Sequence, residues 1–167
     1  PSQPASSAVK LQQLLDGRVL ARYRPGRTGD HALEVTLTGK PLSGSPFKLK
    51  VTPGAPSADK SCLVYACPTQ LTVAESMEFR LQPCDVCGNK CVDGSPSDWL
   101  VDCRVQPRAS SSGVKQADVQ MRNAPGGSHI VSIDCRVSGK YTLSVTDHRN
   151  RHCSGSPLHM QFTAGPA

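Results

Sequence analysis

The sequence predicts an all-β fold, and three observations point to it. Glycine and proline, 14 of each, interrupt the chain at short intervals, as turns between short strands do. Apolar residues alternate with polar ones in several stretches, which is the pattern of strands with one buried face. Aromatic residues make up only 4%, which indicates a small core. One helix-like stretch, Lys10 to Leu15, is too short to be stable alone.

The sequence also contains an internal duplication. Residues 29–51 read GDHALEVTLTGKPLSGSPFKLKV, and residues 139–162 read GKYTLSVTDHRNRHCSGSPLHMQF. Gly139 lies 110 residues after Gly29, and Gly155 lies 111 residues after Gly44. In both copies an alternating stretch leads to a Gly-Ser-Pro triplet and a second alternating stretch. Each copy therefore predicts two consecutive strands, with proline at the start of the second strand, where its missing N–H is tolerated.

Further strand patterns precede this pair in the second copy. They bring the total to about seven short strands within roughly 105 residues, which predicts an immunoglobulin-like β-sandwich. The additional patterns lie at 71–73, 77–81, 99–105, 117–121 and 131–135. The first copy has only later strands, at 19–23, 31–37 and 47–51.

The predicted organisation is one partial and one complete copy in tandem. Residues 1–54 form the C-terminal part of a first repeat, residues 55–60 form a proline-containing linker, and residues 61–167 form a complete second repeat. The sequence does not begin with methionine, so we expect it to be an excerpt of a longer chain.

Residues 21–54, ARYRPGRTGDHALEVTLTGKPLSGSPFKLKVTPG, resemble the end of a filamin repeat. The shared features are a Tyr-x-Pro, a Gly-Asp turn and a Gly-Ser-Pro-Phe strand. The second copy keeps Gly139 to Tyr141 and Gly155 to Pro157, and Asp85 with Gly88-Asn89 resembles the family's Asp-x-x-Gly-Asn. It lacks the Tyr-x-Pro and carries all eight cysteines. The resemblance, over about residues 16–165, indicates a divergent, cysteine-rich member rather than an actin-crosslinking filamin.

The resemblance implies a non-catalytic repeat that acts as spacer or scaffold, with neighbouring repeats and other proteins as partners. It also implies that an extended peptide adds to strand C (98–106) and lies between strands C and D (115–122). The candidate partner-binding residues are Leu100, Asp102, Arg104, Gln106, Gln116, Asp118 and Gln120. Two alternatives stay open: an extracellular adhesion ectodomain of gamete-surface type, and a substrate-recruiting module of a larger ubiquitin-ligase-like enzyme.

The cysteines allow three interpretations: disulfides, free buried thiols or a metal site. We expect at least two disulfides, which would favour an extracellular or cell-surface location over the cytoplasmic alternative. The spacing of the loop cysteines also permits zinc, bound by Cys84, Cys87, Cys91 and Cys153, or with His152 as the fourth ligand. The disulfide candidates are Cys62, Cys67, Cys84, Cys87, Cys91, Cys103, Cys135 and Cys153.

Several other functions are not expected. The net charge of +6 is spread along the chain, and the aromatic residues are scattered, so nucleic-acid binding is not predicted. No apolar run is long enough to enter a membrane. No catalytic constellation or cofactor motif occurs. His31 occupies the position of Tyr141 in the duplication, so we expect it to have a structural role.

Overall fold

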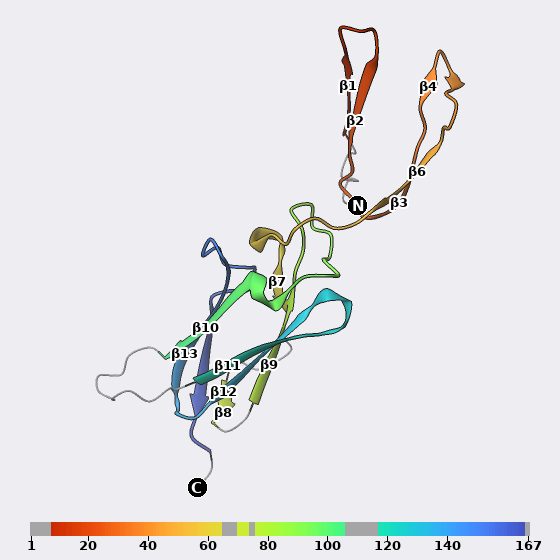
Figure 1. The fold of residues 1–167 in the computed structure, drawn as a ribbon. Helices are drawn as coiled ribbons and strands as arrows, with labels where there is room; N and C mark the ends of the chain where they lie inside the picture. Colours follow the sequence, from red (N-terminus) through yellow and green to blue (C-terminus); the bar gives the residue numbers. More distant parts are fainter. Residues whose placement is uncertain (1–7, 65–69, 74–75, 106–116, 166–167) are drawn as a thin grey trace. The chain divides into compact units, whose positions relative to one another are not determined.

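The computed structural model describes residues 8–64, 70–73, 76–105 and 117–165. The chain divides into two compact units, Pro1–Pro53 (unit 1) and Gly54–Ala167 (unit 2). Regular structure in the described residues consists of β-strands and three short 3₁₀ helices, without an α-helix (Figure 1). The predicted all-β class is confirmed.

Unit 1 consists of three antiparallel strand pairs. These are β1 (Ala8–Gln13) with β2 (Val19–Arg24), β3 (Gly29–Leu33) with β6 (Phe47–Val51), and β4 (Thr36–Leu37) with β5 (Lys40–Pro41). The helix-like interpretation of residues 10–15 is wrong, because pairing with β2 fixes residues 8–13 as a strand. The Tyr23 hydroxyl lies 2.6 Å from His31 Nδ1 and links β2 to β3.

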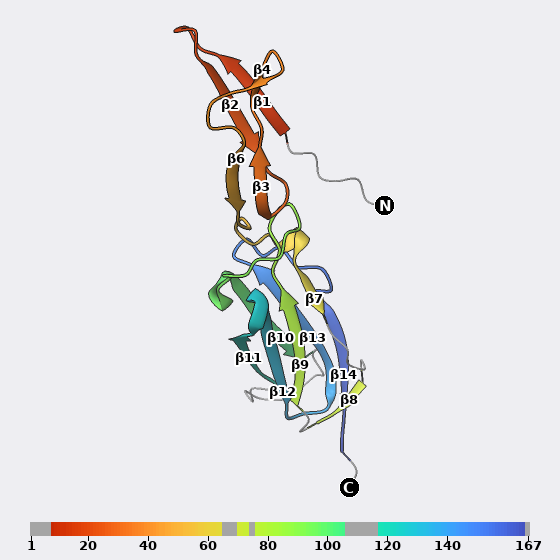
Figure 2. The same ribbon diagram turned by 90° about the vertical axis from the view of Figure 1, so that its right-hand side faces the viewer.

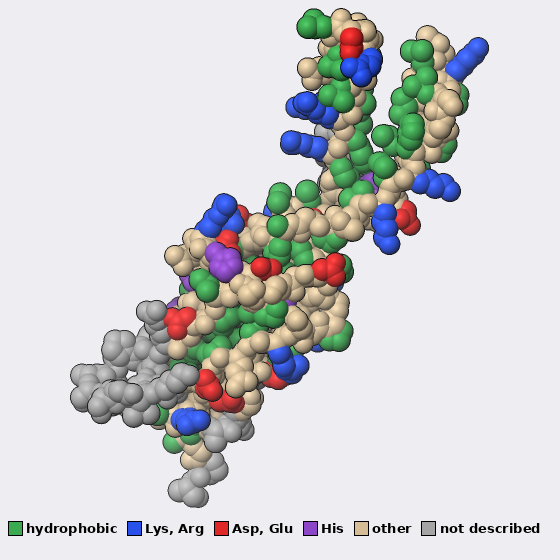
Figure 3. Space-filling model, viewed as in Figure 1, with side chains coloured by type: hydrophobic (Ala, Val, Ile, Leu, Met, Phe, Trp, Pro, Cys, Tyr) green, Lys and Arg blue, Asp and Glu red, His purple; other side chains and the backbone are tan. Residues whose placement is uncertain are grey.

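Hydrophobic side chains remain exposed on unit 1 (Figure 3). Leu11 is 71% exposed, Leu37 66% and Phe47 43%. The strand pairs therefore leave apolar surface uncovered that a closed sandwich would bury.

Unit 2 contains two four-stranded sheets (Figures 1 and 2). The first sheet has the order β10–β13–β14–β8, from β10 (Trp99–Val105), β13 (Gly139–Asp147), β14 (Leu158–Thr163) and β8 (Gln70–Thr72). The second has the order β11–β12–β9–β7, from β11 (Ala117–Asn123), β12 (His129–Cys135), β9 (Ser76–Gln82) and β7 (Cys62–Val64). All neighbours are antiparallel except β14 and β8, which are parallel.

The core of unit 2 lies between these sheets. On β9, Met77, Phe79 and Leu81 are buried and alternate with polar residues that face outward. Tyr141 on β13 packs edge-on against Phe162 on β14, with ring centroids 5.2 Å apart. Alternation on each strand thus supplies the two inner faces of an immunoglobulin-like sandwich. The 3₁₀ helices η1 (Ala58–Lys60), η2 (Pro96–Asp98) and η3 (Pro125–Gly127) lie in the connections.

Candidate partner-binding edge

Two strands of unit 2 lie at sheet edges and next to each other. β10 ends the first sheet and pairs only with β13 among the described strands, and β11 likewise ends the second sheet and pairs with β12. β10 and β11 are in contact across the sandwich. An edge strand offers backbone groups with which another strand can pair.

The hydrogen bonds of Val145 fix which backbone groups of β10 lie on that edge. Its N–H donates to Ser156 Oγ at 2.8 Å, and its carbonyl accepts from the Cys153 N–H at 3.2 Å. The backbone groups of Val145 therefore point toward β14 and away from β10. Its partner in register, Val101, correspondingly points its own N–H and C=O away from β13.

The direction of the backbone N–H and C=O groups alternates from residue to residue along β10, because the register with β13 is continuous. Val101, Cys103 and Val105 therefore present N–H and C=O groups on the open edge. Leu100, Asp102 and Arg104 direct theirs to β13. A partner strand would consequently pair with the odd-numbered residues.

Partly buried apolar side chains lie where the edge strands β10 and β11 contact each other. Those of Val101 and Cys103 on β10 and of Ala117, Val119 and Met121 on β11 pack against the core without being fully covered. We refer to these five residues as the seam. The inward side chains of a strand added to β10 would lie against this apolar surface.

The predicted partner-binding residues do not form one surface. Leu100, which is 47% exposed, and Asp102 lie on the outer face of the first sheet. Asp118 and Gln120 lie on the outer face of the second sheet, which faces the other way. Arg104 pairs with Thr142 in register, and Gln106 and Gln116 lie outside the described residues.

Sequence reasoning thus selected the outward side chains of the two edge strands and missed the seam. The alternating phase of residues 99–105 and 117–121 contained the needed signal, since the inward residues at a sheet edge are those that an added strand would cover.

The seven described cysteines are free thiols. Burial raises the pKa of Cys103 to about 12, and the pKa values of Cys135 and Cys153 to about 11. Such thiols are protonated at neutral pH and react slowly. Cys87 is exposed, and Cys67 lies outside the described residues. The disulfides expected from the sequence therefore stay a prediction.

Among the described residues no group of His, Cys, Asp or Glu side chains has a geometry that could hold a metal ion. The zinc alternative with Cys84, Cys87, Cys91 and Cys153 accordingly gains no support. No described helix has the length and apolar character needed to span a membrane.

The segment Gly54–Ser61, which precedes β7, is bound to the rest of unit 2. The Gly54 N–H donates to Asp85 Oδ2 at 3.1 Å, and Cys91 Sγ lies 3.6 Å from the Gly54 carbonyl oxygen. The Ser57 N–H donates to the Cys84 carbonyl at 2.8 Å. Gly54 and Ser57, at and within the predicted linker 55–60, are therefore bound by the loop that follows β9.

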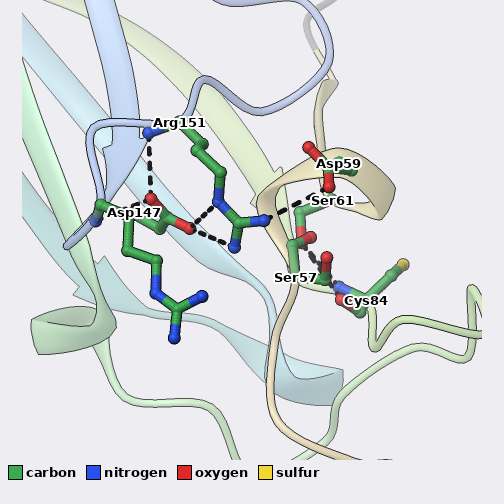
Figure 4. A network of polar contacts seen from close by, with 7 residues as sticks. Ser57, Asp59, Ser61, Cys84, Asp147 and Arg151 are labelled. Carbon is green, nitrogen blue, oxygen red and sulfur yellow. Dashed lines mark hydrogen bonds and ion pairs between the residues drawn. The ribbon is translucent and has the colours of Figure 1, made fainter.

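A second loop contacts the same segment (Figure 4). Arg151 Nε donates to Asp147 Oδ2 at 2.9 Å, and its guanidinium reaches Asp59 Oδ2 at 3.4 Å. Ser61 Oγ donates to the Ser57 carbonyl at 2.8 Å and accepts from the Cys84 N–H at 2.9 Å. The ion pair between Arg151 and Asp59 is exposed and contributes little, so the backbone bonds of the segment fix its position.

Comparison with known proteins finds similarity to filamins. Residues 2–48 match the model of the Filamin/ABP280 repeat. The chain is 26% identical over 160 residues to Filamin-A of Drosophila melanogaster and 26% identical over 194 residues to Filamin-C of Rattus norvegicus. These alignments cover 92% and 99% of this chain but only 6% of each relative.

Solved structures share the fold. The Lin-41 filamin domain is 23% identical with a TM-score of 0.52, and the match covers 67% of this chain and all of that one. The Escherichia coli adhesin FdeC is 16% identical with a TM-score of 0.59, and the match covers 94% of this chain and 48% of that one. At these identities the likeness concerns the fold alone.

Proposed function

We propose, from the premise that this chain carries a divergent filamin-type repeat, that unit 2 binds an extended peptide by β-strand addition to β10. The family match, which lies in unit 1 at residues 2–48, and the immunoglobulin-like fold of unit 2 support a structural or interaction repeat. The observation that carries the finer proposal is the open edge of β10 beside the apolar seam.

The geometry of the edge and the seam favours one kind of partner segment. A strand that pairs with Val101 and Cys103 turns every second side chain toward the seam and the others toward solvent. Positions facing the seam would be apolar, because Val119 and Met121 offer no polar atom for a hydrogen bond there. Positions facing solvent would lie beside Leu100 and Asp102. The expected partner is therefore a segment of alternating apolar and polar residues.

Proline or lysine would protect such an edge against unwanted pairing, and neither occurs between Trp99 and Val105. Asp102 is the negative charge on this strand. Asp102 and Arg104 are the two charged residues of β10, and opposite charges on one strand limit association without closing the edge to a matched partner.

The experiment uses the whole chain and a displayed library of linear 12-residue peptides. Binders are expected to alternate in polarity and to shift the amide NMR signals of Val101 and Cys103. Met121→Lys places a charge in the seam and should weaken the selected peptide at least about tenfold. Gln120→Lys, one residue away on the outer face, is the matched control and should bind normally.

A proline substitution tests the backbone pairing. Cys103→Pro removes an N–H on the open edge and should abolish binding while the protein stays folded. Leu100→Pro removes an N–H that faces β13 and should destabilise the sheet instead. Peptides that bind equally well to the folded Cys103→Pro and Met121→Lys proteins would show that the partner is held elsewhere.

A further inference from the structure

His129, the first residue of β12, is fully buried with one unpartnered ring nitrogen. Its Nδ1 lies 3.1 Å from Asn123 Oδ1 on β11. A carbonyl oxygen can only accept, so in this arrangement Nδ1 carries the proton and donates. The other nitrogen, Nε2, is then an unprotonated acceptor that is buried without a hydrogen-bond partner.

The loop of residues 83–98 closes over this nitrogen. A Cβ atom placed on Gly94 would lie 3.6 Å from His129 Nε2 and 3.8 Å from Pro83 Cγ. The same loop presses on the turn before His129, since a Cβ atom on Gly127 would lie only 2.1 Å from the Cys91 carbonyl oxygen. The loop therefore packs against both His129 Nε2 and the turn before His129.

The 83–98 loop is also the element that holds the segment Gly54–Ser61. Asp85, Cys91 and Cys84 of the loop bind Gly54 and Ser57, as described above. The 83–98 loop consequently contacts both the His129 imidazole and the segment Gly54–Ser61, through different residues. An opening of the loop at Gly94 would also loosen the contacts at Asp85.

A proton on Nε2 would have no acceptor in the closed loop. Burial lowers the pKa of His129, and the nearby carboxylate of Asp98 opposes this effect. The residues opposite His129 in the sheet are Leu81, which is apolar, and Asn123, which is neutral. The closed loop thus favours the neutral imidazole, whereas an exposed histidine takes up a proton near pH 6.5.

The direction of the pH effect follows from this difference. Above about pH 6.5 the imidazole is neutral whether the loop is open or closed, and closure has its full stability. As the pH falls below that value, the open form binds a proton that the closed form binds less readily. Closure therefore weakens on acidification.

We propose that protonation of His129 opens the 83–98 loop and releases the segment Gly54–Ser61 from it. We call the 83–98 loop and His129 together the latch. In this proposal the latch holds the stretch that leads into β7 while the imidazole is neutral and releases it on acidification. This inference stands apart from peptide binding at β10, because none of its residues belongs to the seam.

Hydrogen exchange of the full 167-residue chain tests the latch. The protection factors of the Gly54 and Ser57 amides are measured at pH 7 and at pH 5.5 and corrected for intrinsic exchange. On going from pH 7 to pH 5.5 they should fall by up to about tenfold per pH unit, which is the limit for one linked proton. The amides of Ile133 and Tyr141, at the other end of the sandwich, should keep theirs. The carboxylate of Asp85 remains ionised over this range, because its pKa is lowered.

Two variants assign the effect to His129. His129→Asn keeps an N–H for Asn123 and does not ionise, so its protection factors should not change with pH. Gly94→Ser leaves the imidazole in place and adds a hydroxyl near Nε2 that can accept from the protonated ring, so it should also reduce the pH dependence. His152→Asn, an exposed histidine of the other loop, should leave the dependence unchanged.

The latch would be overturned by several results. Protection of Gly54 that is constant between pH 7 and pH 5.5 would exclude it. A pH dependence of full size in Gly94→Ser, or one that disappears in His152→Asn, would assign it to another group. If the His129→Asn protein does not fold, the Gly94→Ser and His152→Asn proteins decide the question.

Discussion

The hydroxyl of Ser156 accepts a hydrogen bond from the backbone N–H of Val145 at 2.8 Å. Unit 1 contains the same contact, where Ser45 Oγ accepts from the Val35 N–H at 2.9 Å. In both places a glycine with a φ near +85° precedes the serine and a cis proline follows it. The glycine and serine of the triplet thus recur because the turn before the last strand of each copy needs a positive φ and a hydroxyl acceptor.

Ser156→Ala should destabilise unit 2 by about 1–2 kcal/mol, because the Val145 N–H loses its acceptor. Ser154→Ala, whose side chain is exposed, should have little effect. Urea unfolding followed by Trp99 fluorescence measures both. Equal stabilities of the two variants would mean that water replaces the hydroxyl.

Gly127→Ala should destabilise far more than Gly126→Ala. Both glycines have a positive φ, +72° and +74°, so an alanine costs about 1–2 kcal/mol at either position. Only at Gly127 would the new Cβ also collide with the backbone at Cys91 and Val92, which should add about 1–3 kcal/mol. Similar unfolding midpoints for the two proteins would contradict the close approach of loop and turn.

Asp85→Asn should cost about 1–3 kcal/mol at pH 7, because the carboxylate accepts hydrogen bonds from Gly54, Cys87 and Asn89. Burial opposes ionisation of Asp85, but these bonds outweigh it and lower its pKa. Its stabilising contribution is therefore present above about pH 4 and lost as the pH falls further.

Acid titration of the unfolding free energy measures this contribution. The native protein should lose stability more steeply below about pH 4 than the Asp85→Asn protein does. Asp93→Asn, on the exposed part of the same loop, serves as the control. Parallel pH curves for native and Asp85→Asn proteins would contradict the assignment.

Alkylation of the native protein by iodoacetamide at pH 8 should modify Cys87 first. Cys103, Cys135 and Cys153 should react slowest, because burial raises the pKa of Cys103 to about 12 and those of Cys135 and Cys153 to about 11. Peptide mass spectrometry gives the order of modification.

Counting thiols in unfolded, unreduced protein tests the predicted disulfides. Disulfides would leave fewer than eight free thiols.

The fragment 54–167 should fold alone, whereas the fragment 1–53 should not. The first keeps both sheets and the core, and the second leaves Leu11, Leu37 and Phe47 exposed. Dispersed amide NMR signals are expected only from the longer fragment. A dispersed spectrum of residues 1–53 would show that the strand pairs of unit 1 are sufficient by themselves.

The strands that follow strict alternation could be predicted from the sequence. Residues 99–105 and 131–135 read as strands because their inward side chains recur at every second position. β7 was missed, since its residues Cys62, Leu63 and Val64 are all apolar and show no alternation. Residues 10–15 suggested a helix, but pairing with β2 overrides such a weak local preference.

The candidate site was less accessible to sequence reasoning. The direction of the Val101 and Arg104 backbone groups depends on the contact between Val145 and Ser156, which are far from β10 in the sequence. Nor could the sequence show that Gly54 binds Asp85, because alternation carries no information about loop contacts. The protonation of His129 depends likewise on its surroundings in the folded unit.

The binding of Gly54–Ser61 to the 83–98 loop has a mechanical consequence. A pulling force that enters unit 2 from its N-terminal side meets the hydrogen bonds at Gly54 and Ser57 before it reaches β7. These bonds would break one after another rather than together. The freed segment could lengthen to at most about 27 Å, at roughly 3.4 Å per residue. Unit 2 would therefore yield in a small first step under tension, before either sheet bears the load.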